Sequence, residues 1–157
     1  MTLPDGAGAT TQIDHLLLSP YGIFVIETKN YKGWIFASAR QKQWTQKIYK
    51  NSYTFQNPIH QNYKHIKVLE QLLTDIVEPD LLHSVIVFMP DAVFKTPMPN
   101  EVFRAAGWTD YVKSFDQQMI SETKLKRIQL RLEKELLEKF WKTNRKHVES
   151  LKQHKQP

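Results

Sequence analysis

The sequence predicts one domain of the α/β (α+β) class, built on a mixed β-sheet. Three observations support this prediction: 157 residues suffice for one compact core, strand-like patterns fill the first third, and helical patterns dominate the last third. No internal repeat or linker-like stretch divides the chain. We therefore expect a single unit over residues 1–157, with a core over about 10–116 and C-terminal helices over about 121–155.

The first strands form a predicted hairpin. Residues 12–18 (QIDHLLL) and 22–29 (GIFVIETK) are rich in β-branched and aromatic residues, and they flank SPYG, a turn sequence with Pro at its second position. Residues 33–37 and 43–49 predict two further, weaker strands that Lys and Gln interrupt. Residues 51–58 (NSYTFQNP) predict a loop.

A helix is predicted over residues 58–76, because Pro suits a first helical turn and the apolar residues after it follow helical spacing. Residues 84–89 (SVIVFM) are an unbroken apolar run, which is typical of a strand covered on both faces. Residues 90–110 contain several prolines and predict irregular structure, and residues 109–115 (TDYVKSF) predict another strand.

The last part of the chain predicts helices. Ser121 followed by Glu122 is a plausible helix start, and the apolar residues after it repeat at helical spacing. Thr143 is a candidate cap for a final short helix that reaches toward His154. The first of these helices carries no motif, so we interpret it as a packing element.

Composition and charge narrow the function. Lys and Arg total 22 against 16 Asp and Glu, a net charge of +6, which favours polyanionic partners and nucleic acid first. The absence of Cys excludes a disulfide scaffold, a thiolate zinc site and a cysteine nucleophile. No apolar run approaches the roughly 18 to 20 residues that span a bilayer, and the start does not resemble a secretion signal. We expect a cytoplasmic protein with no membrane partner.

One polar cluster on the hairpin is a candidate for chemistry. If SPYG closes the hairpin symmetrically, facing residue numbers sum to 41, so Asp14 lies opposite Glu27 and Gln12 opposite Lys29. A bulge at Gly22 would shift this register by one residue and separate the two acids. In the symmetric register the opposite face carries His15, Ile13, Leu17, Phe24, Ile26 and Thr28.

Two neighbouring carboxylates repel each other unless a cation lies between them. Mg²⁺ takes oxygen ligands, typically one or two carboxylates with water and substrate phosphate. Asp14 and Glu27 are therefore candidate ligands for Mg²⁺ or Mn²⁺, and the main-chain carbonyl of Thr28 could add another oxygen. Lys29 could orient the attacking water or neutralise transition-state charge. This arrangement suits phosphodiester hydrolysis; the alternative is a solvated face of the sheet.

A family resemblance rests on two runs, TTQIDHLLLSPYGIFVIETKNYKGWIF and QWTQKIYKNSYTFQNPIHQNYKHIKVL. Together they closely resemble the nuclease-related domain, NERD, from about Thr10 to Leu73, and TNRKHVESLK (143–152) resembles the usual C-terminal ending of the family. NERD domains are assigned to the PD-(D/E)XK nuclease superfamily. The resemblance therefore implies a restriction-endonuclease-like core, a mixed four-stranded sheet flanked by helices.

The resemblance also implies site residues. Asp14 matches the Asp of the first metal motif, Glu27-Thr28-Lys29 matches the (D/E)xK motif, and Gln61 matches a helical Gln found after the core strands in many relatives. Family members usually begin with a helix before the hairpin, often bearing a Glu that completes the metal site. The stretch MTLPDGAGA is too short and too rich in Gly for this helix, so we expect it to be missing.

Other side chains could contact nucleic acid. Trp34, Trp44 and Tyr49 are available to stack on unpaired bases, although a core position is the favoured interpretation for the tryptophans. His65 shares a helix face with Gln61, and we interpret it as part of an ordinary polar stripe. The lysines that could follow a phosphate backbone, if they are not simply solubilising, include Lys32, Lys42, Lys47 and Lys64.

These patterns predict a divalent-metal-dependent nuclease, a hydrolase of the PD-(D/E)XK type, with Mg²⁺ or Mn²⁺ as cofactor and DNA or another nucleic acid as partner. One alternative is a catalytically impaired nuclease-fold module that binds nucleic acid or a protein. Another is a fragment that folds only as an oligomer. Two basic faces on a duplex would make a homodimer a reasonable arrangement.

Overall fold

A computed structural model describes residues 1–4 and 10–153. Its centre is a four-stranded mixed sheet in the order β10-β8-β4-β3. The first pair, β3 and β4, is antiparallel, whereas β8 is parallel to β4 and β10 is parallel to β8. These strands span β3 (His15–Ser19), β4 (Gly22–Lys29), β8 (Leu82–Phe88) and β10 (Val102–Arg104).

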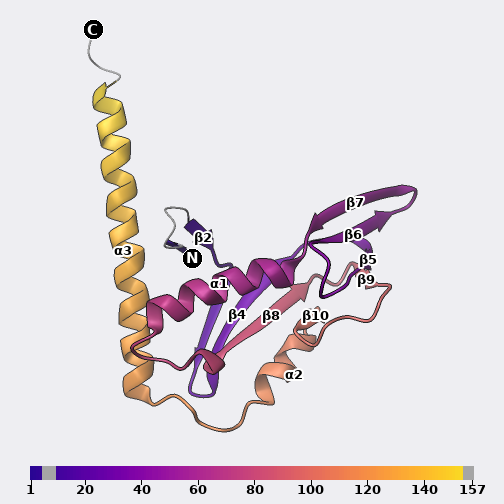
Figure 1. Cartoon of the computed structure of the whole chain (residues 1–157), viewed down its shortest axis with the longest axis horizontal. Coiled ribbons are helices and arrows are strands. Elements are labelled where there is room, and N and C mark those ends of the chain that lie inside the picture. The colour runs from indigo at the N-terminus through magenta and orange to yellow at the C-terminus, as the bar shows by residue number, and fades with distance from the viewer. Residues whose placement is uncertain (5–9, 154–157) are drawn as a thin grey trace.

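Helices cover both faces of the central sheet (Figure 1). One face packs against α1 (Pro58–Leu73) through a core that includes Val25 of β4 and Leu69 of the helix. The other face, with Phe24, packs against α2 (Gly107–Lys113). Neighbouring residues of β4 serve opposite faces because strand side chains alternate. The predicted α+β class with a restriction-endonuclease-like arrangement is confirmed.

The hairpin has the symmetric register predicted from SPYG. His15 pairs with Ile26, and the ladder closes with Ser19 opposite Gly22. The alternation is interrupted just before β3, where the backbone bends at Asp14. As a result, Ile13 is fully buried in the core beneath α1, and its predicted place on the opposite face of the sheet was wrong.

A second four-stranded sheet, in the order β7-β6-β5-β9, extends the ends of β4 and β8. The chain passes directly from β4 into β5 and from β8 into β9, and Lys29 O accepts from Met89 N across this junction at 3.1 Å. Figure 1 shows β6 and β7 projecting as an arm from the central sheet. The strands are β5 (Gly33–Phe36), β6 (Gln43–Ile48), β7 (Asn51–Gln56) and β9 (Ala92–Phe94).

Three predictions for local structure were wrong. Residues 51–56 form the edge strand β7 instead of a loop, because β6 supplies a complete antiparallel partner. Residues 109–115 mostly lie in α2 instead of a strand, and Tyr111 packs edge-to-face with Phe24 of the sheet from this helix. The irregular segment 90–110 also contains the short strands β9 and β10.

The C-terminal part forms one helix, α3 (Glu122–Gln153), in place of the two expected over about 121–155. The helix continues through Thr143, so this residue is not a cap, and His154 lies outside the described residues. Arg131 joins α3 to the end of α1, because its guanidinium donates to the Asp75 carboxylate at 2.9 and 3.0 Å. No described helix is long and apolar enough to cross a membrane.

Two short strands precede the hairpin. They are β1 (Thr2–Pro4) and β2 (Thr10–Gln12), and they pair with each other antiparallel. Within residues 1–4 and 10–14, no helix is described before β3. A 3₁₀ turn, η1 (Pro79–Leu81), leads into β8.

Candidate active site

Glu27 and Lys29 lie two residues apart at the end of β4, on the face that α1 covers. The Lys29 Nζ donates to Glu27 Oε1 at 2.6 Å and to Gln61 Oε1 of α1 at 2.9 Å. The Glu27 side chain is 3% exposed and the Lys29 side chain 14%. The structure therefore joins three of the predicted site residues in one hydrogen-bonded group, most of it withdrawn from solvent.

The first turn of α1 is fixed by its N-cap residue, Asn57, which is fully buried. The Asn57 Oδ1 accepts from Ile59 N at 2.9 Å, and Pro58 occupies the first turn, where its missing N–H costs nothing. The Asn57 amide nitrogen also donates to Gln41 O at 2.7 Å in the loop before β6. This anchoring sets where the next turn, with Gln61, meets β4.

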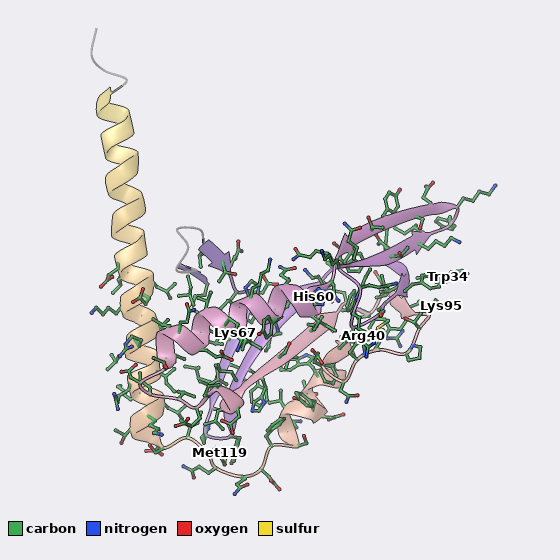
Figure 2. All side chains as sticks on the ribbon, viewed as in Figure 1. Trp34, Arg40, His60, Lys67, Lys95 and Met119 are labelled. Carbon is green, nitrogen blue, oxygen red and sulfur yellow. The ribbon has the colours of Figure 1, made fainter. Side chains whose placement is uncertain are left out.

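A second buried amide fixes α1 on the sheet. The Asn62 Nδ2 donates to Val25 O of β4 at 2.8 Å and to Ser84 Oγ of β8 at 2.9 Å. Because Asn62 follows Gln61 directly, this bridge holds the glutamine side chain over the end of β4. In Figure 2 the labelled His60 marks this end of α1.

His65 lies beside Glu27 in the interior. Its Nε2 is 3.4 Å from Glu27 Oε2, and both atoms are buried without a hydrogen-bond partner. The other ring nitrogen, Nδ1, is hydrogen-bonded to Thr11 Oγ1 of β2. The interpretation of His65 as part of a solvated polar stripe was therefore wrong. Its spacing of four from Gln61 was the signal that could have placed it here.

Asp14 contacts the middle residue of the Glu27-Thr28-Lys29 motif. Its Oδ2 accepts from Thr28 N at 3.0 Å and from Thr28 Oγ1 at 2.9 Å. The N–H and C=O of one strand residue point to the same side, so the Thr28 carbonyl is also directed toward the edge where Asp14 lies. The bend at Asp14 thus brings this carboxylate next to the motif, beyond the end of the β3–β4 ladder.

The Asp14 carboxylate thus lies beside the Thr28 backbone at the edge of β4, whereas the neighbouring Glu27 carboxylate lies on the face toward α1, between Lys29 and His65. The described part of the chain contains no group of three or more His, Cys, Asp or Glu side chains arranged to hold a metal ion. A cation at this edge would need the main-chain oxygen and outside ligands such as water or phosphate, which is the usual coordination of Mg²⁺.

The four lysines that we assigned to nucleic-acid contact are all exposed. They come from different parts of the fold. Two lie in loops that flank the second sheet, one lies on β6, and one lies on α1. They are, in this order, Lys32, Lys42, Lys47 and Lys64.

The fold and this group of residues define a nuclease-related protein. The sequence profile of the nuclease-related domain, NERD, matches residues 1–89, more than half of the chain, so the chain belongs to the NERD family. An uncharacterized protein of Bacillus anthracis is 56% identical over 66 residues, which are 42% of this chain and 31% of that protein. The match thus spans less than a third of the relative. No solved structure matches the chain significantly.

Proposed function

We propose that this chain is a divalent-metal-dependent nuclease domain of the PD-(D/E)XK type that hydrolyses phosphodiester bonds in DNA. One observation carries the proposal: the hydrogen-bonded group of Glu27, Lys29 and Gln61 at the end of β4, in a chain of the NERD family. A buried carboxylate beside an ammonium, with a third group fixing the ammonium, is an arrangement that structural stability alone rarely requires.

The residues fit a divalent cation. Glu27 Oε2 is buried and makes no hydrogen bond, so it has an unused acceptor. We propose that Asp14, Glu27 and the Thr28 carbonyl hold Mg²⁺ or Mn²⁺, which would supply Lewis-acid activation and lower the pKa of a bound water.

Lys29 would act on the reacting phosphate. Its ammonium has three N–H donors, and two of them point to Glu27 Oε1 and Gln61 Oε1. The third is available to a phosphate oxygen or to the attacking water. Gln61 would hold the Lys29 ammonium oriented toward the phosphate, because the position of Gln61 is itself fixed by the N-cap at the start of α1. A preorganised cation of this kind stabilises charge that develops in the transition state.

Charge supports DNA as the substrate. Residues 28–69 contain no Asp or Glu, and they carry the start of α1 and most of the second sheet. A surface of this kind attracts phosphate by displacing its condensed counterions. Eight basic side chains lie in this acid-free segment: Lys29, Lys32, Arg40, Lys42, Lys47, Lys50, Lys64 and Lys67.

The test is cleavage of single- and double-stranded DNA with Mg²⁺ or Mn²⁺. Glu27→Gln and Lys29→Ala should each lower the cleavage rate by on the order of 10²–10³-fold, because each removes a group that acts on the reacting phosphate. Lys124→Ala, at an exposed position on α3, is the matched control and should cleave as the unchanged chain does.

A chelator should abolish cleavage, and circular dichroism should show that the variants remain folded. The proposal is wrong if the two site variants and the unchanged chain cleave equally, or if none of the folded proteins cleaves either substrate.

The alternative is a catalytically impaired nuclease-fold module that binds nucleic acid or a protein partner. One observation favours it: the described residues include no group of three or more His, Cys, Asp or Glu side chains that could hold a metal ion. Such a module would bind DNA in a salt-sensitive manner, and binding would survive both chelation and loss of the two carboxylates.

A further inference from the structure

The outer face of the second sheet carries an exposed tryptophan. Trp34 of β5 is 48% exposed, whereas Trp44 of β6 is fully buried, so the prediction that both belong to the core was wrong for Trp34. The two differ because they lie on opposite faces of the sheet: Trp34 pairs with Lys47, and Trp44 pairs with Phe55 of the buried face.

Cations surround this tryptophan. Lys47 lies directly opposite Trp34 in the β5–β6 ladder, and cross-strand partners share one face. Lys95 directly follows β9, and its Nζ lies 4.4 Å from the centroid of the Trp34 ring. Figure 2 shows Trp34 and Lys95 together at the end of the molecule far from α3.

A hollow of about 430 Å³ lies beside the ring, lined by Lys32, Gly33, Trp34, Lys47, Ile48 and Tyr49. Tyr49 stands at the β6–β7 turn and is 96% exposed, so a second aromatic ring is available next to the first. Gly33 also lines the hollow, and it adopts a φ of 82°, which favours glycine.

This combination matches a particular ligand chemistry. Solvent-exposed aromatic rings provide surfaces on which bases can stack. Neighbouring lysines can contact the phosphates that link those bases. A base pair in an intact duplex hides both of its faces, so only unpaired nucleotides can stack here. The segment that forms most of this face contains no acidic residue to repel phosphate.

We infer that the outer face of the second sheet binds single-stranded DNA, with an unpaired base stacked on Trp34 and phosphates on Lys32, Lys47 and Lys95. The inference rests on the proposed function and deepens it, because it names single strands and frayed ends as the substrate class. The base would take the ring face that Lys95 covers, and the displaced ammonium would remain close enough to contact a phosphate.

The test measures binding in the presence of a chelator, so that no cleavage is needed. The probes are a fluorescein-labelled 15-nucleotide oligo-dT and a labelled 15-base-pair duplex, followed by anisotropy. Trp34→Ala should weaken oligo-dT binding by about 5- to 100-fold and change duplex binding much less, since stacking of one base is lost. Trp34→Phe should retain most of the affinity.

Tyr53→Ala is the matched control. Tyr53 lies in the same sheet and has a similar exposed fraction, 52%, but it pairs with Gln46 on the other face. This variant should bind oligo-dT as the unchanged chain does. Oligo-dT should also quench tryptophan fluorescence in the unchanged chain, and Trp34→Phe should lose this quenching.

Three results would overturn the inference: unchanged oligo-dT binding in Trp34→Ala, an equal loss for the duplex and the single strand, or an equal loss in Tyr53→Ala. Competition by polyglutamate as strong as that by oligo-dT would also overturn it, because charge alone would then explain binding. An inactive nuclease would leave this result intact, since Glu27→Gln should still bind oligo-dT.

Discussion

At the scale of single residues, Glu27 is the most constrained side chain of the site. Each of its oxygens faces a different neighbour, Lys29 at Oε1 and His65 at Oε2. Removing a charge from water costs several kcal/mol, so a buried carboxylate depends on these neighbours. The structure therefore implies that Glu27 and His65 contribute to stability as a coupled pair.

We expect His65→Leu to lower the free energy of unfolding by about 1–3 kcal/mol, because Thr11 and the buried carboxylate both lose a polar neighbour. In a Glu27→Gln background the same exchange should cost less, since an unpaired amide is cheaper to bury than an unpaired carboxylate. Urea unfolding of the four proteins gives the coupling energy, which we expect at about 0.5–3 kcal/mol.

His60→Leu, made in the unchanged chain and in Glu27→Gln, is the control for this double-mutant cycle. His60 lies on the same helix, but the polar partners of Glu27 are Lys29 and His65, so the coupling of His60 to Glu27→Gln should be close to zero. Equal coupling energies for the two histidines would show that His65 and Glu27 do not interact.

At the scale of elements, the junction between the two sheets depends on one glycine. Gly33 begins β5 with a φ of 82°, and a Cβ at this position would lie 2.6 Å from Lys47 O. Both the backbone conformation and the close approach exclude a side chain. A side chain at this position would therefore strain the passage from β4 into β5, the passage that brings Trp34 to the outer face.

We expect Gly33→Ala to lower the free energy of unfolding by roughly 1–3 kcal/mol and to weaken the β5–β6 pairing. Gly107→Ala is the control, because a Cβ at Gly107 in the first turn of α2 meets no atom within 4 Å. That variant should be neutral or slightly more stable. Urea unfolding measures both, and an equal response at the two positions would contradict the argument.

At the scale of the whole molecule, helices cover both faces of the central sheet. His83 lies on the face that α2 covers. Its ring on β8 packs against Phe24 and Phe115, with ring centroids 5.1 and 4.4 Å away. Burial lowers the pKa of His83 below its usual value of 6.5, and the Asp80 carboxylate partly opposes this. Protonation therefore favours the unfolded chain.

The lowered pKa of His83 makes the stability of the fold increase with pH over one window. Between the lowered pKa of the folded chain and the ordinary value near 6.5, the unfolded chain binds more protons. The His83 contribution should therefore stabilise the fold as pH rises through this window and stay constant above it. Melting temperatures from pH 5 to 8, compared with those of His83→Leu, isolate this contribution.

In His83→Leu the rise across the window should be smaller, while the dependence from other groups remains. An identical profile for the two proteins would mean that His83 has the same pKa in both states, contrary to its packing between the two rings.

Much of the fold could be predicted because local patterns and burial agree there. The SPYG turn set the register of the hairpin, and the unbroken apolar run of β8 indicated a central strand. The missed elements lack such agreement. β7 is mostly polar and exposed, so only pairing with β6 makes it a strand. In α2 the aromatic residues suggested a strand, but packing of Tyr111 against Phe24 stabilises a helix.

In the candidate site, too, some residues could be predicted from local pattern and others depended on tertiary contacts. The family pattern named Glu27, Lys29 and Gln61, because short spacing on a strand and a nearby helix suffices to indicate them. Only the bend at Asp14 decided that its carboxylate contacts Thr28, and only the anchoring of α1 decided that His65 lies beside Glu27. The spacing of four indicated that His65 shares a helix face with Gln61, but it did not indicate that this face meets Glu27.

By itself, the sequence determined the alternation of strands and helices, the hairpin register and the basic character of residues 28–69. These properties depend on neighbouring residues and on composition. Tertiary structure alone decided which tryptophan faces solvent and which polar atoms remain without partners in the interior. The physical reason is that burial and cross-strand pairing are set by segments far apart in the chain, whose meeting no local pattern specifies.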